Sequence, residues 1–195
     1  SLRCDMNFLT TLDVSNNPLL TDLRCGWNLI VNIDISNNTL LKTFSIYNYP
    51  NATLTEIDVS NNPDLEFLNI GCNQVSSLEL SNNNKLKTLL VSDNYLTSLD
   101  VSNMPDLERL LCGNSWFTNY SGMQLNSLDA SNNPLLNQLH CAGNNLTTLD
   151  LANNPLITRL SCERNQLTSL DVSNLYLLTS MTCNNNQLTD LNLAN

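Results

Sequence analysis

A seven-residue phrase, LDVSNNP, begins at Leu12 and returns with small changes along the whole chain. The spacing between successive copies is 21 residues, except for one gap of 24 and one of 29. The copies begin at Leu12, Ile33, Ile57, Leu78, Leu99, Leu128, Leu149, Leu170 and Leu191. A fixed period in this range indicates stacked units of supersecondary structure, in which each unit buries its apolar face against its neighbours.

Each period contains two similar halves. One fits L-x-x-L-x-V-x-x-N from Leu9 to Asn17, and the other fits L-x-x-L-x-C-x-x-N from Leu20 to Asn28. In each triplet the outer two side chains share one face of a strand, and the middle one points away. We therefore predict a solenoid of about nine turns, with parallel β strands on two sides of each coil and little or no helix. It forms a single domain over residues 1–195, which we expect to be a fragment of a longer protein.

Asparagines recur at the corners that follow both triplets. An inward amide can donate to and accept from peptide groups that a turning chain leaves without partners. We therefore expect a structural role, in which each asparagine also bonds to the next one in its stack. The two columns are Asn17, Asn38, Asn62, Asn83, Asn133 and Asn154, and Asn7, Asn28, Asn73, Asn94, Asn144, Asn165 and Asn186.

Six of the seven cysteines share one inward column, in which Ile46, Ile70 and Val91 fill the same position in other turns. A thiol that alternates with aliphatic residues behaves as a small buried hydrophobe, so free thiols are expected. One column also cannot surround a metal ion tetrahedrally, which argues against zinc. The column is Cys4, Cys25, Cys112, Cys141, Cys162 and Cys183. Cys72 lies outside it and is expected to be exposed.

An acidic column follows the Leu-Asp-Val triplets on the outward side. Hydrogen bonds from flanking Ser and Thr residues, such as Thr11, Ser98 and Thr148, would favour it. A Ca²⁺ site is the alternative, but a single flat column offers fewer oxygens than this ion requires. The column is Asp13, Asp34, Asp58, Glu79, Asp100, Asp129, Asp150 and Asp171.

Catalysis has few candidate residues. The only histidine, His140, points to the opposite side of its strand from Cys141, so the two cannot form a catalytic pair. The chain has no Gly-rich phosphate loop and no C-x-x-C spacing. We expect a non-enzymatic protein without a cofactor or a metal.

The charge of the chain limits its partners. The formal net charge is -10 and the isoelectric point is about 4.2, which opposes nucleic acids and anionic membranes. No apolar run is long enough to insert into a bilayer. All eight basic residues lie in or beside the Leu-x-Cys half. The outward position of that half also varies, reading Arg3, Arg24, Ser45, Asn69, Leu90, Leu111, His140, Ser161 and Thr182.

Two insertions follow the Leu-x-Cys half, after Ile46 and after Cys112. In each the column asparagine is replaced, by Tyr49 and by Ser115. Aromatic side chains gather there, and exposed aromatics on loops commonly anchor a partner. The alternative is that Trp116 and Phe117 fold back over the core. The candidate binding residues are Trp27, Tyr47, Tyr49, Leu90, Arg109, Leu111, Trp116, Phe117, Tyr120 and His140.

The L-x-x-L-x-C-x-x-N-x-L half and the L-x-x-L-D-V half resemble the leucine-rich repeats, in particular the nested 21-residue class sometimes called IRREKO, found mostly in bacterial proteins. The resemblance covers essentially the whole chain. It implies a right-handed solenoid whose L-x-C strands line the principal, usually concave, sheet. It also implies a binding role and a bacterial extracellular or cell-surface location.

These observations predict a binding module that acts through the variable Leu-x-Cys sheet and the two inserted loops. A protein partner is favoured over a glycan, and flanking domains or segments are expected in the full-length protein. Carbohydrate binding predicts aromatic rings that stand free beside Asn, Asp and Glu side chains. A purely structural stalk predicts a sheet without a patch and a buried Trp116.

Overall fold

A computed structural model of the chain describes residues 1–49, 51, 53–114 and 123–193. Within these ranges the chain forms short strands joined by turns, and it contains no helix. The strands are β1 (Leu2–Arg3), β2 (Asp22–Arg24), β3 (Thr43–Ser45), β4 (Phe67–Asn69), β5 (Thr88–Leu90), β6 (Arg109–Leu111), β7 (Gln138–His140), β8 (Arg159–Ser161), β9 (Ser169–Asp171), β10 (Ser180–Thr182) and β11 (Asp190–Asn192).

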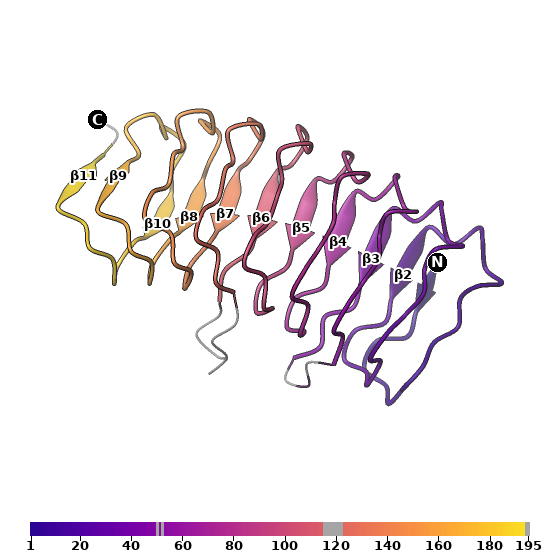
Figure 1. The fold of residues 1–195 in the computed structure, drawn as a ribbon. Helices are drawn as coiled ribbons and strands as arrows, with labels where there is room; N and C mark the ends of the chain where they lie inside the picture. Colours follow the sequence, from indigo (N-terminus) through magenta and orange to yellow (C-terminus); the bar gives the residue numbers. More distant parts are fainter. Residues whose placement is uncertain (50, 52, 115–122, 194–195) are drawn as a thin grey trace.

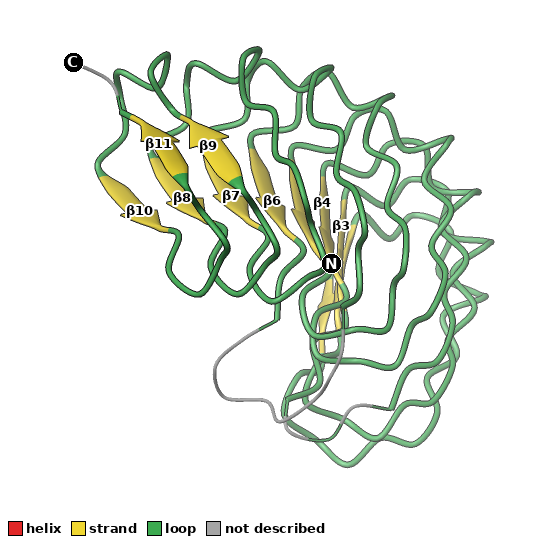
Figure 2. Cartoon of the chain, turned by 60° about the vertical axis from the view of Figure 1, so that its left-hand side comes forward, coloured by secondary structure: helices red, strands yellow, loops and turns green. Residues whose placement is uncertain are grey.

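Nine of these strands form one parallel sheet in the order β1-β2-β3-β4-β5-β6-β7-β8-β10. Each strand comes from the Leu-x-Cys half of one coil, and the coils stack side by side into an arc (Figure 1). The strands lie on the inner side of that arc (Figure 2). The predicted parallel solenoid of about nine turns without helix is therefore confirmed.

The register of the sheet aligns equivalent positions of successive coils. Leu23 pairs with Phe44, Phe44 with Leu68, and Leu68 with Leu89. All four side chains point inward and are fully buried. Because each coil presents one such layer to the next, a side chain of the wrong size disturbs two neighbours, which explains the constancy of these positions.

The Leu-Asp-Val side differs from the prediction of strands on two sides of every coil. Only β9 and β11 pair there, and the other described coils form no ladder on that side. The coils spread apart on the outer side of the arc, as Figure 2 shows. A ladder needs strands about 4.8 Å apart, so the spreading separates these segments while the inner sheet stays paired.

The corner asparagines hold the outer side instead. The Nδ2 of Asn83 donates to the carbonyl oxygens of Val59 and Asn62, both at 3.0 Å. Asn38, Asn62, Asn133 and Asn154 bond in the same way to the coil before them. The expected bonding of corner carbonyls is confirmed, although the acceptors are backbone oxygens rather than asparagine side chains.

Two coils lack an asparagine in this column and use the preceding residue instead. Met104 occupies the column position, and Asn103 donates to the carbonyl oxygens of Leu80 and Ser81 at 3.1 and 2.8 Å. Leu175 likewise occupies the position in a later coil, where Asn174 bonds to the preceding coil. The corner therefore requires one amide, which either of two adjacent residues can supply.

The cysteine column lies beneath the sheet, and its thiols are free. Burial raises the pKa of Cys25, Cys112 and Cys162 to about 12, so these thiols stay protonated and unreactive. The prediction that Cys72 is exposed is wrong, since only 6% of its surface is accessible. Its backbone is left-handed at φ 54°, and its Sγ lies 3.5 Å from Oδ2 of Asp93.

Candidate partner-binding face

The outward side of the nine-stranded sheet carries two columns of side chains, which together we call the open face. The second column contains the variable positions that sequence analysis identified. The first column consists of Asp22, Thr43, Phe67, Thr88, Arg109, Gln138, Arg159 and Ser180, and the second of Arg3, Arg24, Ser45, Asn69, Leu90, Leu111, His140, Ser161 and Thr182. These side chains make no part of the backbone ladder, which leaves their identity free to vary.

An apolar patch occupies the middle of the open face. Leu90 and Leu111 are register neighbours, and Phe67 lies in the first column one coil earlier. All three are half-buried. Sequence analysis missed Phe67 because it followed only the second column, although the residue before each Leu-x-Cys triplet has the same outward direction. We call Phe67, Leu90 and Leu111 the apolar patch.

At the N-terminal end of the open face, the charged side chains pair with one another. Asp22 accepts hydrogen bonds from Nη2 of Arg3 and Nε of Arg24, both at 3.1 Å. Partial burial raises the pKa of Asp22, but the two guanidinium groups outweigh it, so that this pKa lies below its usual value. The Cζ of Arg24 also lies 5.7 Å from the centre of the Phe67 ring, at cation–π distance.

His140 on β7 lies under the electrostatic influence of two buried carboxylates, Asp93 after β5 and Glu163 after β8. Asp93 and Glu163 are 6% and 3% exposed. Glu163 accepts hydrogen bonds from Oγ of Ser161 at 2.6 Å and from Oγ1 of Thr182 at 2.7 Å. Burial lowers the pKa of His140 despite the opposing effect of Glu163 and Asp93, so the imidazole is neutral at pH 7.

Gly113 creates the space that His140 occupies. A Cβ atom at Gly113 would lie 2.7 Å from Cε1 of His140 and 2.7 Å from the backbone of Ala142. No side chain larger than hydrogen fits there without moving the next coil. The imidazole of His140 therefore lies in the space left by the missing side chain of Gly113. His140 is also the register neighbour of Leu111.

A second group of predicted site residues gathers at the corner of the second and third coils. The Trp27 ring centre lies 5.8 Å from that of Tyr47 and 6.3 Å from that of Tyr49. Trp27 is 41% exposed, whereas both tyrosines are half-buried. Gly26 precedes Trp27, and a Cβ atom on it would lie 2.6 Å from the carbonyl oxygen of Tyr47. We call Trp27, Tyr47 and Tyr49 the aromatic cluster.

The predicted site residues thus fall into two groups. Arg109, Leu90, Leu111 and His140 lie together on the open face in the fifth to seventh coils, while the aromatic cluster lies in the second and third. Trp116, Phe117 and Tyr120 lie outside the described residues.

At the two insertions, residues before the replaced column positions supply the amides. Asn48 donates to Oδ1 of Asn73 at 3.0 Å, and Asn114 donates to the carbonyl oxygen of Met123 at 3.0 Å. The column asparagine is absent at both insertions, as expected, and an amide on the preceding residue bonds within the corner.

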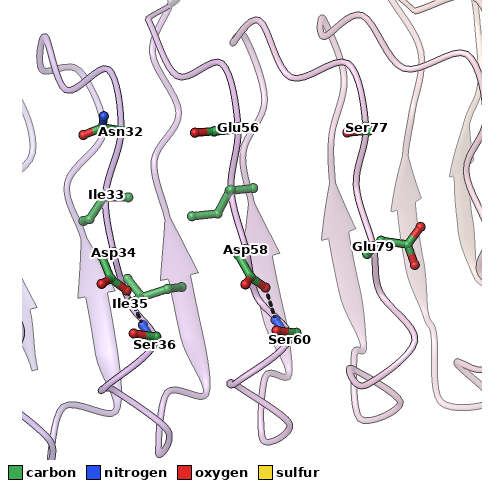
Figure 3. Close-up of a pocket in the computed structure, with 11 residues that line it drawn as sticks. Asn32, Ile33, Asp34, Ile35, Ser36, Glu56, Asp58, Ser60, Ser77 and Glu79 are labelled. Carbon is green, nitrogen blue, oxygen red and sulfur yellow. Dashed lines mark hydrogen bonds between the residues drawn. The ribbon is translucent and has the colours of Figure 1, made fainter.

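The acidic column lies on the outer side of the arc, and three of its members, Asp34, Asp58 and Glu79, line a shallow hollow of about 810 Å³ (Figure 3). Oδ1 of Asp34 and of Asp58 accepts a hydrogen bond from the backbone N–H two residues later, at Ser36 and Ser60. The donors are flanking serines, as expected, but they lie two residues after each aspartate, and residues such as Thr11, Ser98 and Thr148 that precede it are not the donors. The local turn explains the aspartates, and the described residues contain no group of three or more His, Cys, Asp or Glu side chains able to hold a metal ion.

Known leucine-rich-repeat proteins resemble this chain in both sequence and structure. The sequence profile of the Leucine Rich Repeat family matches residues 8–29. The functional domain of InlJ from Listeria monocytogenes, which includes a cysteine ladder, is 39% identical with a TM-score of 0.88. The alignment covers 96% of this chain and 40% of that one. The chain is a leucine-rich-repeat protein.

Other leucine-rich-repeat structures share the fold. An internalin, inlF, from Listeria monocytogenes is 20% identical with a TM-score of 0.77, over 93% of this chain and 56% of that one. YopM, a leucine-rich effector protein from Yersinia pestis, is 26% identical with a TM-score of 0.71, over 96% of this chain and 50% of that one. The chain thus spans about half or less of each of these relatives. No curated protein sequence matches it significantly.

These leucine-rich-repeat relatives are bacterial, and the fold they share typically serves protein–protein interaction. The nested 21-residue subclass stays a prediction. Among the described residues, no helix has the length and apolar character needed to cross a membrane.

Proposed function

We propose that this chain is a non-enzymatic module that binds a protein partner through the open face. The observation that carries the proposal is the apolar patch, since Phe67, Leu90 and Leu111 lie in the middle of an outward sheet surface that no other element of the described chain covers. Apolar and aromatic side chains surrounded by polar ones are typical of the energetic centre of an interface.

The surroundings of the patch support recognition rather than non-specific adhesion. Small or polar side chains, including Thr88, Asn69 and Ser45, border it in the register. Charged groups lie beside it, with Arg24 near Phe67 and Arg109 on β6, the strand that carries Leu111. We further propose a bacterial extracellular or cell-surface location, which rests on the internalin relatives.

The test is capture of partners on immobilised protein, followed by calorimetry with each purified candidate. Leu90→Gln combined with Leu111→Gln is expected to weaken binding at least tenfold. The matched control is Leu19→Gln combined with Leu40→Gln, because those leucines are exposed but lie away from the sheet. Equal binding by both double variants would refute the role of the open face.

Carbohydrate binding is the second candidate function, and the exposed Trp27 of the aromatic cluster favours it. A ring that packs on two tyrosines yet stays 41% exposed can stack on a sugar. A glycan array with wild type and Trp27→Ala separates the two functions. Glycan binding that Trp27→Ala abolishes and the Leu90→Gln, Leu111→Gln variant retains would favour the carbohydrate function.

A further inference from the structure

The distribution of ion pairs singles out two arginines on the open face. Five of the eight basic side chains pair with carboxylates within 4.0 Å, and Arg164 makes other interactions. Arg109 and Arg159 form no ion pair with any described residue. Both are exposed, in a chain whose net charge is -10. Although carboxylates outnumber basic side chains in this chain, neither Arg109 nor Arg159 pairs with a described one. Both guanidinium groups are therefore available to an external anion.

The sheet places these two arginines in one row. The register aligns Arg109 with Gln138 and Gln138 with Arg159, so all three lie in the first column of the open face. Two strand spacings separate the arginine backbones by about 9.6 Å. The sheet lies on the inner side of the arc (Figure 2), and on a concave sheet we expect outward side chains to converge. Both guanidinium groups can therefore reach one anion above Gln138.

Two carboxylates lie close to this row along the chain, and neither pairs with its arginines. Glu108 precedes Arg109 and is exposed. Glu163, beyond the second column, is buried and accepts hydrogen bonds from two hydroxyl groups. Neither forms an ion pair with Arg109 or Arg159.

We infer that the open face binds an acidic segment of a protein partner, with a carboxylate held above Gln138 between Arg109 and Arg159 and an adjacent apolar side chain on Leu90 and Leu111. This inference rests on the proposed function and names the chemistry of its partner. Guanidinium groups bind carboxylates through paired, charge-assisted hydrogen bonds, and the amide of Gln138 can add a further donor. The apolar patch and the arginine row lie on adjacent strands, so one extended segment can contact both.

A carboxylate fits this row better than a phosphate-rich ligand. The net charge of -10 repels anions at long range, and that repulsion grows with the charge of the ligand. A segment with one or two carboxylates meets little of it, whereas a nucleic acid or an anionic membrane meets much more. The two arginines therefore act as a local contact that selects an acidic side chain after apolar docking.

The test uses a phage-displayed library of peptides about twelve residues long, selected against the immobilised whole chain. We expect enriched peptides to contain Asp or Glu next to a large apolar residue. Arg109→Gln combined with Arg159→Gln should weaken binding of a synthetic enriched peptide at least tenfold. Lys42→Gln combined with Lys85→Gln is the matched control, because these exposed side chains pair with Glu66 and Asp64 outside the two columns of the open face, and it should leave that affinity within about twofold.

The outcomes separate this inference from the proposed function. Enriched peptides without acidic residues, whose binding depends on Leu90 and Leu111, would overturn the inference and leave the open face as the binding surface. Equal affinity of the arginine double variant and the lysine double variant would do the same. A selection with no enrichment, or with peptides indifferent to both the arginines and the leucines, would count against both. Replacing Glu by phosphoserine in the peptide tests the anion, and tighter binding of the phosphopeptide would contradict the choice of a carboxylate.

Discussion

The two long sides of each coil satisfy their backbones in different ways. On the inner side, each strand donates and accepts through the parallel ladder, and the outward side chains take no part in it. On the outer side, the turns depend on side chains, namely Asp oxygens that accept from the backbone and Asn amides that donate to it. The outer side must therefore repeat its sequence, whereas the open face can change residue by residue and acquire a binding function.

The largest effect is expected at the corner amides of the outer side. Asn83→Leu alone should cost about 1 kcal/mol, because Asn82 can replace the lost amide as Asn103 does beside Met104. Asn82→Ala combined with Asn83→Leu should cost about 2–4 kcal/mol, since the carbonyl oxygens of Val59, Ser60 and Asn62 then lose their amide donor. Urea unfolding measures both.

Additivity checks the mechanism of this replacement. If Asn82 takes over the function of Asn83, the double variant must lose more than the sum of the two single variants. A double variant that costs only that sum would show that each corner amide acts alone, and the asparagine pairs of the outer turns would need another explanation.

The next effect concerns the cysteines beneath the open face. Their burial raises the pKa of Cys25, Cys72, Cys112 and Cys162 to about 12. At pH 8 a thiol reagent should modify these four more than about 100-fold more slowly than in urea, because exposure requires local opening of the coil stack. Half-buried Cys4 and Cys183 are the internal controls and should react first. Rapid modification of all seven in the native state would show that the sheet does not protect its core.

A smaller effect is expected from acid on the outer side. The hydrogen bonds from Ser36 and Ser60 lower the pKa of Asp34 and Asp58 in the folded chain. A folded pKa below the unfolded value of about 3.9 gives stability that is present above pH 3.9 and is lost as the pH falls through the folded pKa. The urea midpoint should therefore decrease below about pH 3.9.

Asp34→Asn combined with Asp58→Asn is the matched control for this pH dependence. The amide oxygen can accept the same backbone hydrogen bond, so the turn remains while the two titrating groups are removed. The variant should lose less stability on acidification than wild type. An identical decrease in both proteins would assign the acid sensitivity to other carboxylates.

The smallest effect on stability is expected on the open face. Arg109→Gln, Arg159→Gln and Thr88→Ser should each change the free energy of unfolding by less than about 0.5 kcal/mol, since these side chains make no ladder bonds. The same measurement on Asn103→Ala serves as the contrast from the outer side. Losses above about 1 kcal/mol at the three sheet positions would contradict the separation of stability from recognition.

Much of the fold follows from the sequence because the spacing of apolar residues in each repeat determines which side chains point inward. Alternating Leu and Cys predict the inward columns, and the adjacency of Leu90 and Leu111 is confirmed by the register. Burial of Cys72 could not be predicted, since it depends on a left-handed corner that turns the thiol toward Asp93. The replacement of the missing amide at Met104 by the amide of Asn103 also could not be predicted. The two adjacent asparagine positions of each turn look alike in a single sequence, so coordinates were needed to see which one bonds.

The candidate site was predicted less completely than the fold. The second column of the open face was evident from its variability, and it contains Leu90, Leu111 and His140. Phe67 and the alignment of Arg109 with Arg159 became visible only with the first column and its register. Ion pairing also depends on side-chain conformation, so the sequence could not distinguish the unpaired arginines from the paired ones.

A single scan tests the central claim most directly. Every residue from Leu65 to Asn94 would be replaced by all others, and each variant would be scored for stability by its resistance to protease. The account predicts broad tolerance at outward sheet positions such as Asn69, Thr88 and Leu90, and intolerance at Asn73 and Asn94, with a smaller loss at Asn83 because Asn82 lies beside it. Equal tolerance of the corner asparagines, or outward sheet positions as restricted as they are, would contradict it.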